Sequence, residues 1–367
     1  MSQFSILELQ NCIAQTINLD SSFFGSNADL KKMKLSAHLK IRKFLLFLDD
    51  MWDPLNLKQL GVEIGNGKGS RVVFSTRNGD LVRQMNTEKS LQLQPLSPEE
   101  AWELFHNVAF KDGHLPDGIE HIARRVAGEC KGLPLAINVI ASTMIGITAV
   151  DQWTLALSQM QTVDPNFPRT HPCVKYELYH ILRCSYDRLP DAGLKNYFLY
   201  CAMFPGDKDI EVDKLVGMWI AEGIVESKNP AMLEETLKSY IRLLVDRCLF
   251  EEERFPQGIV FLKAHNVLRD MAIYIGEKEE NCLFRVGQMH EQFPLEVREN
   301  CKRMSLYDNN IRCLPQKGLK CTKLVSLILR GNKELEEIPE EFLINFTCLK
   351  VLDLSRTKIK ALPTSLW

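Results

Sequence analysis

Two adjacent aspartates, Asp49 and Asp50, directly follow an unbroken apolar run, Phe44 to Leu48. A run without polar alternation predicts a strand that is covered on both faces, as in a parallel sheet, and such strands end at a ligand crevice. Two unpaired carboxylates at the end of a buried strand would be costly, whereas a Mg²⁺ ion that bridges phosphate groups would remove that cost. The alternative is that both acids are simply solvated at the end of the strand.

Three other sets of residues have types that suit a phosphate or a nucleotide. Arg77 follows a predicted strand, and its guanidinium fork suits phosphate oxygens, although a surface ion pair is the alternative. Pro134 comes after Gly132 and Leu133 and stands at the favoured first position of a predicted helix. His265 lies at the start of another predicted helix, where it is either a ligand or an ordinary polar surface residue.

A phosphate-cradling loop of the form GxxxxGKS or GxxxxGKT does not occur in the sequence. The nearest glycine-rich stretch, residues 61–70, ends in Lys68, Gly69 and Ser70, and no helical pattern follows it. We therefore predict a turn there, and the candidate phosphate site has no glycine loop of its own.

The elements that position Asp49, Asp50 and Arg77 have an alternating pattern. Helical periodicity covers residues 5–17 and 27–40, and strand patterns cover residues 44–48, 71–75 and 91–94. Alternation of this kind predicts an α/β unit with a parallel sheet.

Residues 97 to 275 have mainly helical patterns. Ser97, Pro98 and Glu100 form a capping box with proline at the first helical position, which predicts the start of a helix. A hairpin among the later helices favours a winged-helix arrangement. Further helices are predicted near 117–129 and 133–146, and the hairpin strands near 249–253 and 259–263.

The last part of the chain is repetitive. A pattern of apolar residues with an asparagine or threonine recurs every 24 residues and ends at Pro315, Pro339 and Pro363. This period predicts leucine-rich repeats, in which each repeat gives one short strand to a curved sheet and an asparagine satisfies backbone groups in the turn. Because the sequence stops at Trp367 without a polar cap, we expect that this end of the repeat array is not natural.

Composition limits the classes of partner. The 367 residues have 45% hydrophobic and 25% charged content with a net charge of -2, so no basic field would recruit nucleic acid. The predicted helix at 232–248 balances acidic with basic residues, which also opposes DNA reading. We expect no membrane span and no secretion signal, and the scattered cysteines fit a reducing cytosol.

Taken together, these segments resemble the nucleotide-binding, leucine-rich-repeat (NB-LRR) disease resistance proteins of plants, in the subgroup with a coiled-coil head. The resemblance covers nearly the whole chain, and its motifs stand in the family's order. They are KFLLFLDDMW (Walker B strand, 43–52), GSRVVFSTRN (sensor strand, 69–78), LQLQPLSPEEAWELF (91–105), CKGLPLAINVIA (GLPLA motif, 130–141), YFLYCAMFPGD (winged-helix signature, 197–207) and KAHNVLRDMA (Met-His-Asp motif, 263–272).

The resemblance implies a role for each candidate residue. Asp49 would hold Mg²⁺, and Asp50, as the catalytic residue, would position the attacking water. Arg77 would sense the γ-phosphate. Pro134, with Gly132 and Leu133, would meet the adenine, and His265 would contact the β-phosphate of ADP. The last motif departs from the family at Ala264 and Asn266. Because neutral hydrogen bonds contribute roughly 1 kcal/mol against roughly 1.5–3 kcal/mol for charged ones, we expect a weaker latch on ADP.

The implied architecture is multidomain. It comprises a partial P-loop NTPase α/β domain (1–96), a helical domain (97–165), a winged-helix domain (166–285) and truncated leucine-rich repeats (286–367). In the family the P-loop strand lies between the strands at 44–48 and 71–75, and the resemblance places it upstream of residue 1. Without it these two strands either pair with each other or leave unpaired backbone groups at buried edges.

The implied function is a cytoplasmic ADP/ATP-binding switch of innate immunity, present as a fragment. Its partners would be proteins: a pathogen effector, a guarded host protein or further copies of itself. The family hydrolyses ATP slowly, and this chain lacks the Walker A loop that hydrolysis needs. The alternative function is a non-enzymatic remnant that binds protein partners through its repeats and helical domains.

Overall fold

The computed structural model describes residues 5–19, 27–64, 69–76, 78–111, 118–161, 176–206, 208–223, 230–255, 258–317 and 319–364. The chain divides into two compact units, residues 1–94 and 95–367. The finer domain boundaries expected from the sequence stay a prediction.

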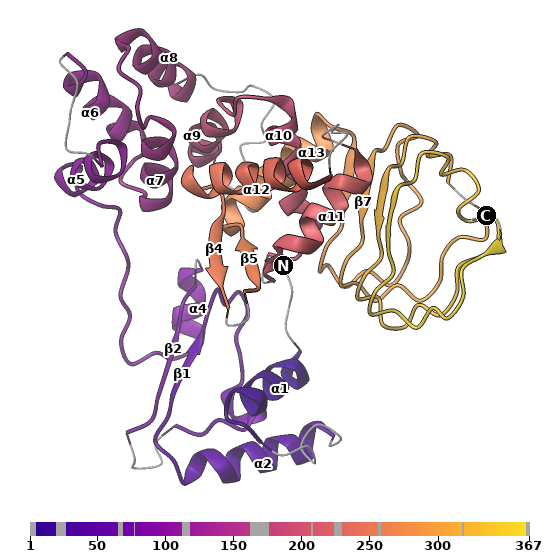
Figure 1. Ribbon diagram of the computed structural model, residues 1–367. Coiled ribbons are helices and arrows are strands. Elements are labelled where there is room, and N and C mark those ends of the chain that lie inside the picture. Colours follow the sequence, from indigo (N-terminus) through magenta and orange to yellow (C-terminus); the bar gives the residue numbers. More distant parts are fainter. Residues whose placement is uncertain are drawn as a thin grey trace. The chain divides into compact units, whose positions relative to one another are not determined.

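The first unit combines helices with a parallel pair of strands (Figure 1). Ser5 caps its first helix in a capping box with Glu8. The helices and strands at 5–17, 27–40, 44–48 and 71–75 are confirmed within a few residues, whereas the two short helices α3 and α4 were not predicted. In chain order the elements are α1 (Ile6–Thr16), α2 (Ala28–Lys40), β1 (Leu45–Leu48), α3 (Leu57–Leu60), β2 (Arg71–Phe74) and α4 (Gly79–Gln84).

Strands β1 and β2 pair directly, with Leu45 opposite Arg71 and Leu48 opposite Phe74. Of the two arrangements expected without a strand between them, the structure therefore has the closed one. The prediction that β1 is covered on both faces was wrong, because Leu45 and Phe47 are 56% and 67% exposed. Leu46 packs in the core of this unit, so one face is covered and one is open. An apolar run indicates a hydrophobic strand, but it does not determine whether other elements pack on one face of that strand or on both.

The predicted third strand at 91–94 was also wrong. These residues form no strand, and Leu91 and Leu93 are each 85% exposed. A Leu-Gln alternation fits a half-buried strand, but strand formation depends on a neighbouring strand and a packed face. Pro95, which follows directly, has no backbone donor for a ladder.

The second unit begins with a compact group of helices. Ser97 and Glu100 form the predicted capping box, and proline stands at the first position of α5. Phe105 and Trp153 are fully buried in the shared core. The helices are α5 (Pro98–Ala109), α6 (Glu120–Glu129), α7 (Pro134–Thr143), α8 (Val150–Gln161) and α9 (Tyr176–Asp187).

The predicted hairpin is confirmed as β4 (Glu251–Arg254) and β5 (Val260–Lys263). A third strand, β3 (Ile210–Glu211), completes an antiparallel sheet in the order β3-β5-β4, and its two residues were too few to predict. The helices around this sheet share one hydrophobic core, which includes the fully buried Trp219 of α11. They are α10 (Ala192–Leu199), the 3-10 helix η2 (Tyr200–Met203), α11 (Val212–Glu222), α12 (Pro230–Asp246) and α13 (Asn266–Lys278).

The repetitive part forms a four-stranded parallel sheet in the order β6-β7-β8-β9, called the repeat sheet below. Strands β7 to β9 lie where each sequence repeat predicts one strand, whereas β6 was not predicted. The buried Asn332 donates to the carbonyl oxygens of Leu306 (2.9 Å) and Leu329 (2.7 Å) and accepts from the N–H of Ile311 (3.1 Å). The strands are β6 (Cys282–Phe284), β7 (Arg303–Ser305), β8 (Ser326–Ile328) and β9 (Val351–Asp353).

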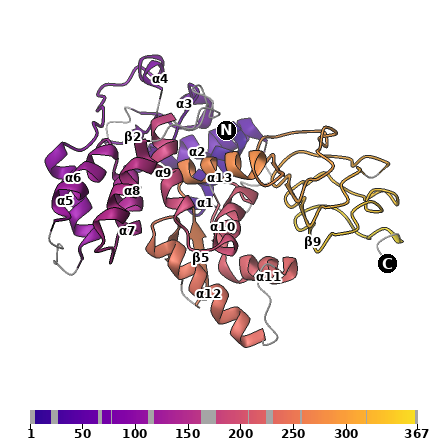
Figure 2. The same cartoon turned by 90° about the horizontal axis from the view of Figure 1, so that it is seen from above.

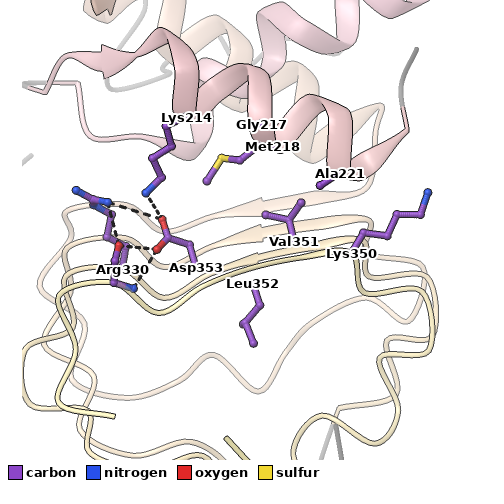
Figure 3. A pocket seen from close by; sticks show the side chains of 10 residues that line it. Lys214, Gly217, Met218, Ala221, Arg330, Lys350, Val351, Leu352 and Asp353 are labelled. Carbon is purple, nitrogen blue, oxygen red and sulfur yellow. Dashed lines mark hydrogen bonds and ion pairs between the residues drawn. The ribbon is translucent and has the colours of Figure 1, made fainter. Parts of the chain in front are cut away.

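Helix α11 lies against the repeat sheet (Figure 2), and charged groups hold the two together. Arg303 on β7 forms an ion pair with Glu222 at the end of α11, 2.8 Å between Nη2 and Oε2, and both side chains are buried. At the other end of α11, Lys214 pairs with Asp353 on β9 (Figure 3). A groove of about 430 Å³ remains between α11 and β9, with Gly217 and Met218 on its helical wall.

Substituting Asp353 with asparagine is expected to destabilise the second unit at pH 7 and to matter progressively less at acid pH. Burial alone would raise the pKa of Asp353, but hydrogen bonds from Lys214 and Ser355 outweigh burial, and the pKa lies below its ordinary 3.8. The carboxylate's contribution is therefore present above the unfolded pKa of about 3.9 and is lost as pH falls through the lower folded pKa. Urea midpoints of wild type and D353N, measured at falling pH, should converge. A constant gap would contradict this role.

Candidate functional site

The two aspartates lie at the carboxyl end of β1, where a serine from β2's end joins them. The Ser75 hydroxyl donates to Asp49 Oδ1, and the N–H of Asp50 donates to Ser75 Oγ at 2.8 Å. Asp50 has a positive φ of 50°, and its Oδ2 accepts from Trp52 Nε1 at 3.2 Å. Sequence reasoning missed Ser75. Its position at the end of the neighbouring parallel strand was the signal that could have found it.

Asp49 has the chemistry of a Mg²⁺ ligand. Its side chain is exposed, and Mg²⁺ in phosphate sites keeps several waters and takes only one or two carboxylates. Asp50 is half-buried and turned toward the indole of Trp52. Among the described residues, no group of three or more His, Cys, Asp and Glu side chains is arranged to hold a metal ion.

Arg77 lies outside the described residues, so its predicted role at the γ-phosphate stays a prediction. Its neighbours on both sides are anchored. Thr76 Oγ1 donates to the carbonyl oxygen of Met51 at 2.7 Å, and the Asn78 side chain caps α4 by accepting from the N–H of Asp80 at 3.0 Å.

Gly132 has a structural role that the sequence did not reveal. Its φ is +67°, and an added Cβ would collide with the carbonyl oxygen of Leu96. The same two residues are joined by a hydrogen bond from the N–H of Leu96 to the carbonyl oxygen of Gly132, 2.9 Å long. Leu133 and Pro134 then begin α7, with the proline at its first position as predicted and its ring exposed. Contact of that ring with an adenine stays a prediction.

His265 is the N-cap of α13 and is exposed. Its Nδ1 accepts from the N–H of Val267 at 3.3 Å, so the neutral ring carries its proton on Nε2. Nε2–H is therefore the atom that would donate to a phosphate oxygen. Ala264 is buried, 7% exposed, in the core around the helices α10 to α13, which suits its small side chain.

The structure brings Asp49 and Asp50 together with Ser75 in the first unit. Gly132, Leu133, Pro134 and His265 belong to the second unit, where they stand at the beginnings of α7 and α13. Within the ranges that the structure describes, no helix has both the length and the apolar character that a bilayer crossing requires.

Comparison with known proteins assigns two parts of the chain. Residues 1–114 match the NB-ARC domain, and residues 203–272 match the disease resistance protein winged helix domain. The chain therefore contains an NB-ARC domain and a winged-helix domain of the disease-resistance type. Helices α11 and α12, the hairpin of β4 and β5, and His265 lie within the winged-helix match.

Similar proteins of Arabidopsis thaliana are named as disease resistance proteins. Disease resistance protein SUMM2 is 34% identical over 98% of this chain and 41% of its own length. Disease resistance protein RPS5 is 32% identical over 99% of this chain and 44% of its own length. Probable disease resistance protein At4g27220 is 33% identical over 89% of this chain and 35% of its own length. The chain thus spans less than half the length of the curated relatives it matches.

Proposed function

We propose that this chain, which carries an NB-ARC domain and a disease-resistance winged-helix domain, acts in plant defence as part of an ADP/ATP-dependent switch. The observation that carries the proposal is the NB-ARC match over residues 1–114, within which an exposed Asp49 stands at the carboxyl end of a parallel strand. Strand ends of this kind are where open α/β sheets bind their ligands.

The proposed switch uses the groups described above. Asp49 holds Mg²⁺, Asp50 orients water and Arg77 senses the γ-phosphate. The segment from Gly132 to Pro134 meets the adenine, and His265 donates through Nε2 to the β-phosphate. Exchange of ADP for ATP changes the conformation only to the extent that the two nucleotides differ in affinity for the two states.

The repeat segment, residues 286–367, is proposed to be the beginning of a leucine-rich-repeat array. Its support is the 24-residue period in the sequence together with one parallel strand per period and the buried asparagines Asn309 and Asn332 in the turns. Such arrays present repeated surfaces to proteins. The proposed partners are therefore a pathogen effector, a guarded host protein or further copies of the chain, in the cytoplasm.

A second candidate function is a protein-interaction module that does not bind nucleotide. The observation that favours it is the direct pairing of β1 with β2, since the resemblance places a phosphate-loop strand between them. The sequence also contains no GxxxxGKS or GxxxxGKT loop.

Calorimetric titration of the folded chain with ADP and with ATP, each in Mg²⁺, separates the two functions. The switch predicts submicromolar binding that weakens about tenfold or more in D49N and in H265A, because each loses a charged contact worth about 1.5–3 kcal/mol. The matched control is D80N, which removes only a surface ion pair with Arg83 on α4. If the sample has the circular dichroism of a folded protein but binds neither nucleotide, the switch is rejected and the interaction module remains as the function.

A further inference from the structure

The direction of the His265 ring depends on where the first turn of α13 sits, because His265 is the residue that immediately precedes this helix. Its Nδ1 is held by the N–H of Val267, and its carbonyl oxygen accepts from the N–H of Arg269 at 3.0 Å. Anything that fixes Val267 and Arg269 therefore also fixes the backbone and the ring of His265.

Arg269 connects this first turn to the segment Phe204–Gly206. Its Nε donates to the carbonyl oxygen of Phe204 at 2.6 Å, a charge-assisted bond across 65 positions of the sequence. One residue thus binds the carbonyl oxygen of His265 through its backbone and a distant carbonyl oxygen through its side chain.

A second contact joins the same two parts. Asn266, the first residue of α13, places its Oδ1 so close to Gly206 that a Cβ there would approach it to 2.6 Å. Gly206 does not have a positive φ, so the glycine serves this close approach and not a left-handed turn.

The segment Phe204–Gly206 is itself held from the other side by the repeat sheet. The Phe204 ring is 6% exposed and meets the Tyr307 ring edge-on at 6.2 Å between centroids. Just before it, the carbonyl oxygen of Met203 accepts from the buried Ser305 hydroxyl at 2.7 Å. Arg269 therefore anchors the start of α13 to a segment that is packed on the first strands of the repeat sheet.

We propose that Arg269 is a positioning residue for His265: by bonding Phe204 it holds the first turn of α13 so that the His265 Nδ1 stays on the Val267 amide. This role deepens the proposed nucleotide contact of His265 and rests on that proposed function for its biological meaning. The geometry itself can be tested without any nucleotide.

The opposite end of α13 supplies a matched control. Arg183 on α9 binds Glu279, which follows the last turn of α13, through two bonds of 2.6 Å and 3.0 Å. R269M removes the bond to Phe204 beside His265, whereas R183M removes the contacts of Arg183 with Glu279, Asp187 and Tyr179 at the other end of the helix. Methionine has no hydrogen-bond donor and about the same length as the arginine stem.

The test uses nuclear magnetic resonance on the full chain with labelled histidine. In R269M we expect the Val267 amide to exchange about tenfold faster, because losing a charge-assisted hydrogen bond worth roughly 1.5–3 kcal/mol makes the first turn of α13 easier to open. We also expect the ¹⁵N signal of His265 Nδ1 to move toward that of a free imidazole. R183M should leave both signals at their wild-type values, and R269K should retain them in part, because lysine can still donate to Phe204 whereas methionine cannot.

Unchanged His265 signals in R269M would overturn the proposal, and so would equal changes in R269M and R183M. A titration of the wild type with ADP is read separately. If wild type does not bind ADP, the proposed function fails, while the ring and amide signals still decide whether Arg269 positions His265.

Discussion

Replacing Arg303 with methionine is expected to lower the free energy of unfolding of the second unit by about 3–5 kcal/mol, the cost of leaving one partner of a buried ion pair uncompensated. Arg303 donates through Nε and Nη2 to Glu222 at 2.8–3.1 Å and through Nη1 to Asn196 at 3.3 Å. The Ser326 hydroxyl also donates to Glu222. Burial alone would lower the pKa of Arg303, but the hydrogen bonds and charge of Glu222 outweigh burial and raise it.

Chemical denaturation followed by fluorescence measures this loss as a shift of the unfolding midpoint. K358M is the matched control, because Lys358 pairs with Glu334 at the exposed rim of the repeats, and its loss should leave the midpoint unchanged. The double variant R303M/E222M should recover much of the stability, since apolar side chains often replace a buried pair without loss. Equal midpoints for R303M and K358M would show that the buried pair does not hold α11 to the repeat sheet.

Replacing Gly132 with alanine is expected to cost about 2–5 kcal/mol. A left-handed backbone costs a residue with a Cβ about 1–2 kcal/mol, and forcing an atom into a packed space costs about 1–3 kcal/mol more. The atom with which the added Cβ would collide is the carbonyl oxygen of Leu96. The same residue donates its N–H to the carbonyl oxygen of Gly132, so the collision would also disturb this hydrogen bond just before α7.

At Gly128 the same substitution is expected to raise the free energy of unfolding. It lies within α6, is exposed and has nothing within 4 Å of an added Cβ. G128A should therefore raise stability by about 0.5–1 kcal/mol, because alanine is the better helix former. Thermal or urea unfolding of both variants is the measurement. A G132A midpoint equal to or above that of wild type would mean that the backbone at Gly132 accepts a side chain, which contradicts the described contact.

The helices were the most predictable part of the fold. The capping box of Ser97 with Glu100 marks a helix start that the structure confirms, because a cap uses residues three positions apart. Two predictions were wrong for the opposite reason: the strand at 91–94, and a covering layer on both faces of β1. Both depend on a partner that is distant in the sequence, and neither composition nor alternation reports whether that partner is present.

The candidate site divides in the same way. The sequence by itself determined the acids at the end of β1, the proline at the start of α7 and the histidine at the start of α13, because each is defined by its place in one local element. The repeat period likewise determined the positions of β7 to β9, since identical spacing gives identical local structure.

Only the tertiary structure decided which distant residues complete these positions. Ser75 bridges Asp49 and Asp50 because β1 and β2 pair directly, and Arg269 reaches Phe204 because α13 packs beside η2. Glu222 meets Arg303 because α11 crosses the repeat sheet. The physical reason is that these are bonds across tens of residues. Their geometry is fixed by packing of whole elements, whereas caps, helix starts and repeats are fixed by hydrogen bonds within a few residues.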